Sequence, residues 1–153
     1  MIEIKHLYKS FEDKDVLIDI NAVFEDGKTN LIIGQSGSGK TVLMKNIVGL
    51  FTPTSGQILY DGRDFINMTK REQVLIRREM GMIFQSAALF DSMSVLENVM
   101  FPLDMFSNDT HRDRIRRARF CLERVNLIDA QKKYPGEISG GMQKRVAIAR
   151  AIA

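Results

Sequence analysis

The residues most able to do chemistry stand in one segment, Gly34 to Thr41, with the sequence GQSGSGKT. This segment fits G-x-x-x-x-G-K-[ST], the pattern of the loop that wraps the phosphates of a nucleotide, or P-loop. Its glycines permit a tight turn in which successive backbone N–H groups point inward at an anion. Lys40 is placed to reach the β- and γ-phosphates, and the Thr41 hydroxyl to hold Mg²⁺. Glycine-rich turns also occur without a ligand, but the residue types here favour a nucleotide.

The elements on either side of the loop support the same interpretation. A short apolar run, Leu31 to Ile33, precedes the loop, and a helical pattern over residues 40–50 follows it. The start of such a helix offers free N–H groups and the positive end of its dipole to phosphates. We therefore expect ATP and Mg²⁺ as ligands. The residues expected to contact them here are Gly34, Gln35, Ser36, Gly37, Ser38, Gly39, Lys40 and Thr41.

Composition narrows the class of protein. The 153 residues suffice for one ordinary domain, and the formal net charge of +3 is too mild to predict a nucleic-acid partner. The single cysteine, Cys121, excludes an internal disulfide framework and suits a reducing cytoplasm. No apolar run approaches the roughly 18 to 20 residues of a membrane span, and the N-terminus lacks the apolar stretch of a signal peptide. We expect a cytoplasmic protein that reaches a membrane through a partner.

The first part of the chain alternates strands with helices, which predicts an α/β nucleotide-binding core over residues 1–89. The expected elements begin with a strand at Ile2 and an antiparallel β-hairpin of residues 16–24 and 28–33 around Asp26-Gly27. The helix 40–50 and a strand at 57–60 follow. The last two elements are a helix to about Arg78, opened by the capping box Thr69–Glu72, and a buried strand 80–84 that ends at Gln85.

After residue 89 the pattern contains helices only, which predicts an α-helical subdomain over residues 90–153. The expected elements are a helix from the capping box Ser94–Glu97 to Pro102, a basic helix over 110–125, a short helix at 128–133 and a last helix from Ser139. This last helix reaches residue 153 without Gly, Asn or Pro to end it. We therefore expect a C-terminally truncated chain, the front portion of a longer protein.

A second candidate anion site lies at the start of the last helix. Ser139 is a natural N-cap, and Gly140 and Gly141 let an anion approach the free N–H groups. Alone, this pattern is typical of a plain helix cap. Together with the P-loop, however, ISGGM at residues 138–142 and the helix after it resemble the LSGGQ signature motif of the ATP-binding subunits of ABC transporters. Ile replaces the usual Leu, and Met replaces the usual Gln.

The resemblance to ABC ATPases covers essentially the whole chain and implies roles for further residues. Phe11 lies 23 residues before Gly34, where the family carries an aromatic side chain that stacks on adenine. Gln85 is similar to the family's Q-loop glutamine, which contacts Mg²⁺ and the attacking water. The implied catalytic residues are therefore Lys40 and Gln85, and the implied metal ligands are Thr41 and Gln85.

The family also requires residues that the resemblance does not locate in this chain. These are a Mg²⁺-binding aspartate and a glutamate general base on the next strand, and a histidine in a later loop. His6 and His111 stand elsewhere in the sequence. We therefore expect ATPase activity only from a longer form of the protein. Because the next strand would pair centrally in the sheet, we also expect incomplete packing of these 153 residues.

Within the family, residues 84–103 and the methionine of ISGGM are most similar to the ATPases of Mla-type phospholipid transporters. This resemblance implies an ATPase at the inner face of the cell membrane that drives transport of lipid or another hydrophobic substrate. It also implies a homodimer, in which Ser139 to Gly141 of one copy close over the ATP of the other. A transmembrane permease would dock near residues 86–106.

Three alternatives stay open: the ATPase of another ABC transport system, a soluble ABC protein acting on ribosomes, and a fragment that only binds ATP. ABC-like ATPases of chromosome maintenance and DNA repair are disfavoured. They place long coiled-coil or zinc-bearing insertions between the P-loop and the signature motif, and only 98 residues separate Lys40 from Ser139.

Two groups of side chains have a plain structural interpretation. The arginines of the helix 110–125 could form a nucleic-acid surface, but an apolar stripe that includes Cys121 favours the solvated face of an amphipathic helix. The second group is rich in Met and Phe, and we expect most of it in the core and the remainder in a groove for a helix of a membrane partner. Its members are Phe90, Met93, Met100, Phe101, Met105 and Phe106.

Overall fold

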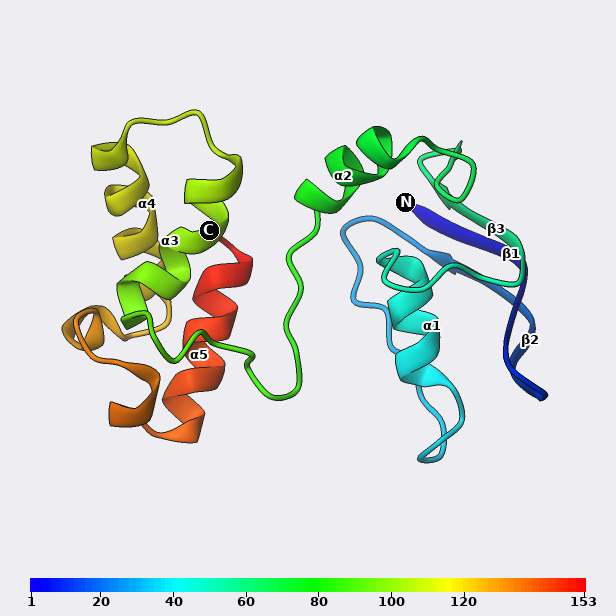
Figure 1. The fold of residues 1–153 in the computed structure, drawn as a ribbon, viewed down its shortest axis with the longest axis horizontal. Helices are drawn as coiled ribbons and strands as arrows, with labels where there is room; N and C mark the ends of the chain where they lie inside the picture. The colour runs from blue at the N-terminus through cyan, green and yellow to red at the C-terminus, as the bar shows by residue number, and fades with distance from the viewer. The chain divides into compact units, whose positions relative to one another are not determined.

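The computed structural model describes all 153 residues and divides them into two compact units, Met1–Glu79 and Met80–Ala153. The first unit contains a four-stranded β-sheet and two α-helices, and the second contains helices only (Figure 1). None of these helices combines the length and the apolar character that crossing a membrane requires.

The sheet of the first unit is antiparallel, with the strand order β2-β1-β3-β4. Its strands are β1 (Ile2–Phe11), β2 (Lys14–Phe24), β3 (Ser55–Tyr60) and β4 (Arg63–Asp64). In the central strand β1, Ile4 pairs with Ala22 of β2 and with Ile58 of β3. Ile4, Leu7 and Ile58 are buried. Ile4 pairs with Ile58, and an irregularity of β1 between Ile4 and Leu7, where His6 has a φ of 46°, interrupts the alternation of side chains that would otherwise turn Ile4 and Leu7 to opposite faces. The predicted opening strand and the strand near 57–60 are confirmed, and the sheet contains an N-terminal antiparallel hairpin, which is formed by β1 and β2.

Two of the predicted strands are wrong. Residues 28–33 and 80–84 form no strand, and β2 pairs with β1 instead of with residues 28–33. Leu31 and Ile33 are 82% and 80% exposed, and Ile83 is 54% exposed. A strand needs a neighbour that pairs its N–H and C=O groups, and the sheet has no strand beside either segment. Both segments therefore leave apolar side chains exposed.

Helix α1 (Lys40–Ile47) follows the phosphate loop and turns Leu43, Asn46 and Ile47 inward. It ends before Gly49, whose φ of 73° cannot continue a helix, so it is shorter than the predicted 40–50. The hydroxyl of Tyr60 in β3 donates a hydrogen bond to the carbonyl oxygen of Ile47. The sheet is thereby tied to the end of the helix that follows the loop.

Helix α2 (Lys70–Arg78) begins at its predicted capping box. Thr69 Oγ1 accepts a hydrogen bond from the backbone N–H of Glu72, and Glu72 Oε2 accepts one from the backbone N–H of Thr69. Both interactions satisfy N–H groups that a helix start leaves without an intrahelical partner.

The second unit is built on α3 (Val95–Phe106), α4 (His111–Arg124) and α5 (Gly140–Ala151), with 3₁₀-helices η1 (Ile128–Ala130) and η2 (Pro135–Glu137). The three α-helices pack on one another around an apolar core (Figure 1). Val99 of α3, Leu122 of α4 and Val146 of α5 are fully buried in this core. The helical elements expected after residue 89 are therefore present.

The end of α3 differs from the prediction, whereas the burial of Cys121 in α4 agrees with it. Helix α3 does not stop at Pro102 but continues to Phe106. Pro102 has no N–H group to donate within the helix. The next residue, Leu103, packs against the apolar core, and this packing compensates for the missing hydrogen bond. In α4, Cys121 is buried beside Leu122 as expected, and burial raises the pKa of its thiol.

Candidate nucleotide-binding site

The phosphate loop has a backbone that favours glycine at two positions. Gly37 and Gly39 have φ values of 81° and 90°, in the left-handed region that L side chains rarely adopt. A Cβ atom at Gly39 would also lie 3.0 Å from the carbonyl oxygen of Val16. The tight turn expected between residues 34 and 39 is therefore present, and its shape depends on these two glycines.

Lys40, the first residue of α1, turns its ammonium group back to the loop. Its Nζ donates hydrogen bonds to the carbonyl oxygens of Gly34 at 2.8 Å and Gln35 at 2.6 Å. The backbone N–H of Ser38 donates to the same Gln35 carbonyl at 3.2 Å. The loop thus closes on its own lysine, which places a positive charge where an anion entering the loop would meet it.

The N-terminus of α1 also suits an anion. Its N-cap, Gly39, makes no side-chain hydrogen bond, and its first turn contains no acidic residue. The first N–H groups of a helix lack intrahelical acceptors, and the helix dipole favours negative charge there. Thr41 is exposed beside Lys40. Free N–H groups, an ammonium group and a hydroxyl together fit the phosphates of a nucleotide and its Mg²⁺ ion.

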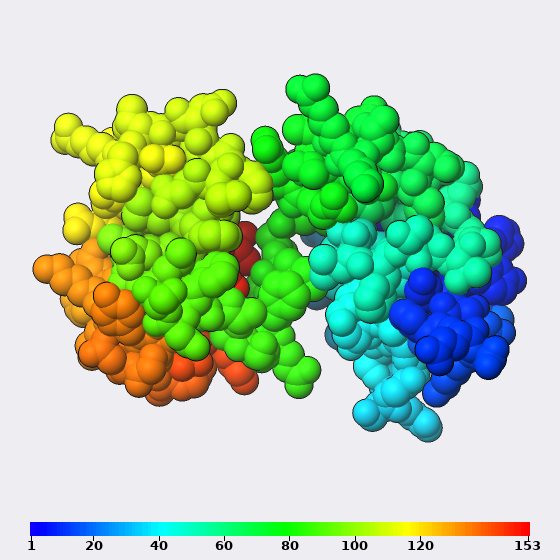
Figure 2. Space-filling view, viewed as in Figure 1, coloured from blue at the N-terminus to red at the C-terminus, as the bar shows by residue number.

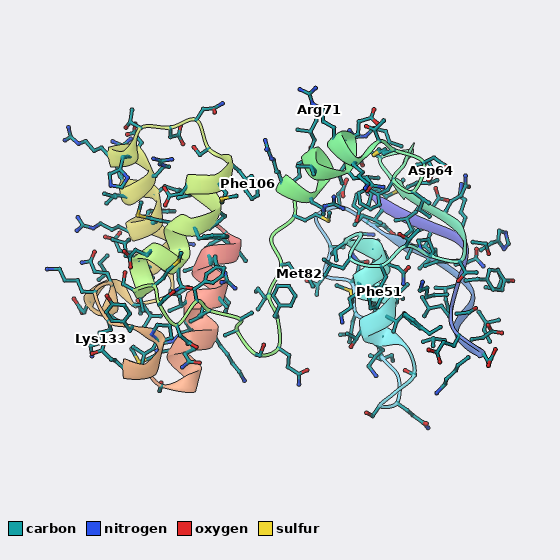
Figure 3. The ribbon with its side chains drawn as sticks, viewed as in Figure 1. Phe51, Asp64, Arg71, Met82, Phe106 and Lys133 are labelled. Carbon is teal, nitrogen blue, oxygen red and sulfur yellow. The ribbon has the colours of Figure 1, made fainter.

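Phe11, the expected adenine-stacking residue, lies at the end of β1 as one member of an aromatic pair. Its ring meets that of Phe51 edge-on, with 5.4 Å between the ring centroids. Each ring also has a lysine nearby, with Lys9 Nζ 4.8 Å from the centroid of Phe11 and Lys45 Nζ 5.0 Å from that of Phe51. Figure 3 labels Phe51, which lies in the turn after α1. This partner was not predictable from local sequence patterns, because the pair forms only through the fold.

The second candidate anion site is an open helix start. Ser139 is the N-cap of α5, and its Oγ accepts a hydrogen bond from the backbone N–H of Met142 at 3.3 Å. A Cβ atom added at Gly140 or Gly141 would meet no atom within 4 Å. Gln143 anchors this helix start, because its Nε2 donates to the carbonyl oxygen of Pro135 at 2.9 Å. The predicted cap is confirmed, and the space in front of it is free.

Gln85 lies in an exposed segment that α5 holds in place. A strand was predicted immediately before Gln85, but the structure has none there. The segment leads to Ala87 and Ala88, whose φ values are 61° and 49°. Arg150 of α5 donates from Nη2 to the Ala87 carbonyl at 2.9 Å and from Nη1 to the Ala88 carbonyl at 2.8 Å. Partial burial lowers the pKa of the Arg150 guanidinium, which nevertheless stays charged. Sequence reasoning missed Arg150, because its spacing from Gln85 is not a local signal.

Each unit contains some of the candidate residues. Phe11 and Gly34 to Thr41 belong to the first unit, and Gln85 and Ser139 to Gly141 belong to the second. Of the two histidines, His6 contacts Asp19 through Nδ1 at 2.7 Å, and His111 begins α4.

Comparison with known proteins establishes the class. Residues 17–153 match the protein family described as ABC transporter, so the chain belongs to this family. A solved structure described as the dimeric structure of MJ0796, a bacterial ABC transporter cassette, superposes with a TM-score of 0.91 at 33% identity. It covers 100% of this chain and 69% of that one. The expected fold, a P-loop ABC ATPase core with antiparallel strands and a helical part, is therefore confirmed.

Two curated relatives indicate which type of ABC ATPase this chain is similar to. The chain is 42% identical to the intermembrane phospholipid transport system ATP-binding protein MlaF of Haemophilus influenzae, over 100% of this chain and 58% of that protein. It is 39% identical to the probable ribonucleotide transport ATP-binding protein mkl of Mycobacterium leprae, over 99% of this chain and 44% of that protein. The chain is thus similar to ABC ATPases of the Mla and Mkl type, and it spans about half the length of these two relatives.

Proposed function

We propose that this chain is the ATP-binding part of an ABC transport ATPase, in which ATP binding and hydrolysis drive movement of a substrate through a membrane permease. The observation that carries this proposal is the phosphate loop, where Lys40 lies against the carbonyls of Gly34 and Gln35 in front of an uncapped helix start. Membership of the ABC transporter family supports it.

In this proposal the chain's own residues bind and orient the nucleotide. Lys40 exchanges its two carbonyl partners for oxygens of the β- and γ-phosphates, and the N–H groups of the loop and of α1 bind the same phosphates. Phe11, supported by Phe51, stacks on adenine. The Thr41 hydroxyl and Gln85 would hold Mg²⁺, which would neutralise charge on the phosphate oxygens, and Gln85 would orient the attacking water. Because a glutamine side chain is no base, we place the general base outside these 153 residues.

The complete site requires two copies of the protein. We place Ser139 to Gly141 of one copy over the γ-phosphate of the ATP held by the other copy. The open space in front of Gly140 and Gly141 supports this arrangement, as does the dimeric state named for MJ0796. Such a pairing is isologous, with two equivalent sites about a two-fold axis.

The permease is placed on the segment of residues 86–106. Phe90 is 41% exposed and packs on Phe101, with ring centroids 4.7 Å apart. Met105 and Phe106 at the end of α3 are 58% and 48% exposed, and Phe106 is labelled in Figure 3. A surface rich in Met and Phe suits a helix of a membrane protein, which would hold the ATPase at the inner face of the cell membrane.

The transported substrate in this proposal is a lipid or another hydrophobic molecule. The relative MlaF, named for phospholipid transport, supports this choice at 42% identity. The relative mkl is 39% identical to this chain and is named for probable ribonucleotide transport. It supports a second candidate, the ATPase of a different transport system. Transfer of a fluorescent phospholipid and of a ribonucleotide, measured with the intact protein and its permease in proteoliposomes, distinguishes the two.

The two-copy site is tested by Ser139→Arg in the intact protein. The long cationic side chain would block the helix start, so we expect a monomer that still binds ATP but neither dimerises on ATP nor hydrolyses it. Ser139→Thr keeps a capping hydroxyl and serves as the matched control. Light scattering measures dimerisation, and phosphate release measures hydrolysis. Normal dimerisation and hydrolysis by Ser139→Arg would remove the two-copy site from the proposal.

A further inference from the structure

The protein's excess positive charge lies on one helix. Of the 22 basic and 19 acidic residues in the chain, α4 holds six arginines, one aspartate and one glutamate. The helix therefore has a net charge of +4, while the remainder of the chain is close to neutral with 16 basic and 17 acidic residues. The net positive charge is therefore concentrated on this helix, although most basic residues lie elsewhere in the chain.

Part of this charge borders a shallow hollow on the outside of α4. The hollow has a volume of about 420 Å³ and is lined by Arg112, Ile115, Arg116, Arg119, Phe120 and Glu123. Residues at this spacing share one helix face, and in the space-filling view the yellow side chains of α4 project from the surface (Figure 2). The face extends over three helical turns, roughly 16 Å, which is the length of a short partner helix.

The charges on this face are largely without internal counterions. Arg112 makes no hydrogen bond or ion pair, and Arg119 donates from Nε only to the neutral side chain of Gln131 at 3.0 Å. Arg116 is the member with an acidic partner, Asp113, at 2.7 Å. An anionic group approaching Arg112 and Arg119 would therefore not have to displace an existing carboxylate.

An exposed aromatic ring stands among these arginines. Phe120 is 49% exposed, and the guanidinium carbon of Arg117 lies 5.7 Å from its ring centroid. Ile115, one turn earlier, is half-buried and packs against the core of the second unit. The face thus combines an apolar centre with a basic border, which is the complement of an acidic amphipathic helix.

We propose that this face of α4 binds an acidic amphipathic helix of a partner protein. Carboxylates of the partner pair with Arg112 and Arg119, and its apolar side chains cover Phe120. Glu123 at the far end of the hollow sets the direction of the helix, because it would repel a carboxylate and attract a basic residue. A flat anionic bilayer fits this face less well, since it would bring Glu123 against like charge. The permease segment proposed above, residues 86–106, adjoins this face, because Leu103 lines a neighbouring hollow with Arg116 and Phe120.

The test uses the intact protein and a fluorescent peptide of about 18 residues, long enough for a stable helix when designed with glutamates and leucines on one face. A scrambled peptide of equal composition and vesicles of phosphatidylglycerol are the comparison probes. We expect the helical peptide to bind at least about tenfold more tightly than the scrambled one. Fluorescence anisotropy measures binding of the peptides, and sedimentation measures binding to the vesicles.

Charge reversal locates the binding site. Arg112→Glu with Arg119→Glu should weaken binding of the helical peptide about tenfold or more, because two attractive contacts become repulsive. Lys133→Glu with Lys144→Glu changes two exposed lysines of the same unit and should leave the affinity within about twofold. Equal binding of the scrambled peptide, an equal loss in both double variants, or vesicle binding with no peptide binding would each overturn the proposal. Circular dichroism confirms that both variants fold.

Discussion

The Nη1 atom of Arg150 lies 2.8 Å from the carbonyl oxygen of Ala88, and this hydrogen bond links the end of α5 to the segment that carries Gln85. A second bond from the same guanidinium reaches Ala87 at 2.9 Å. Helix α5 begins at Ser139, so one rigid helix joins the candidate γ-phosphate contact to the candidate water-orienting residue. A shift of α5 would therefore be transmitted to the Gln85 segment.

Arg150→Ala removes both hydrogen bonds, so we expect slower ATP hydrolysis by the intact protein with an unchanged affinity for ATP. A misplaced Gln85 should lower the rate by about tenfold or more. Phosphate release gives the rate, and calorimetry gives the affinity. Arg150→Lys should recover part of the rate, and Lys144→Ala, an exposed change on the same helix, should retain all of it. A wild-type rate for Arg150→Ala would show that α5 does not position Gln85.

The pair of Phe11 and Phe51 predicts coupled effects on nucleotide affinity. Phe11→Ala should weaken ATP binding by about tenfold through loss of stacking, and Phe51→Ala should weaken it less, because it removes only the ring that supports Phe11. The double variant should bind ATP no worse than Phe11→Ala, since residues in contact are not additive. Ile18→Ala, at an exposed position of β2, is the control. Calorimetric titration decides, and strictly additive losses would mean that Phe51 acts independently.

Gly39→Ala tests the geometry of the phosphate loop. The substitution forces an L side chain into a φ of 90° and against the Val16 carbonyl, so we expect a loss of about 1–3 kcal/mol in stability and loss of ATP binding. Gly136→Ala is the matched control, because its Cβ would meet no atom within 4 Å. Urea unfolding and ATP titration measure the two effects. Normal ATP binding by Gly39→Ala would contradict the loop geometry.

The raised pKa of the buried Tyr60 side chain predicts that the folded protein loses stability at alkaline pH. Burial raises the pKa of Tyr60 to about 12, from an ordinary value of 10.0. Between these values the unfolded chain loses the phenolic proton while the folded protein keeps it, so unfolding becomes more favourable by about 1.4 kcal/mol per pH unit. Below pH 10 this residue gives no pH dependence. Tyr60→Phe should unfold more easily at neutral pH but should lose less stability between pH 10 and 12. Identical pH profiles from urea unfolding would exclude the effect.

Local signals predicted the helices well. The capping boxes at Thr69 and Ser94 and the N-cap Ser139 lie where expected, because each depends on residues three positions apart. The phosphate loop was predictable for the same reason, since its glycines and Lys40 are close together in the sequence. The buried stripe of α4 followed from helical periodicity alone.

Long-range pairing was not predictable to the same degree. Residues 28–33 and 80–84 have the composition of buried strands, but strand formation depends on a neighbour elsewhere in the chain. The contacts of Phe11 with Phe51, and of Arg150 with Ala88, also join residues far apart in sequence. Such contacts follow from the assembled fold and leave no pattern in a single sequence.

The most direct measurement is calorimetric titration of the intact protein with Mg-ATP, comparing wild type with Lys40→Ala and Lys28→Ala. Lys28 is an exposed lysine of the same unit, paired with Glu25, so its loss controls for the change in net charge. The proposed site predicts that Lys40→Ala abolishes high-affinity binding, because Lys40 supplies the cation of the phosphate loop, and that Lys28→Ala binds as wild type does. Unchanged ATP affinity in Lys40→Ala would contradict the nucleotide site on which the proposed function depends.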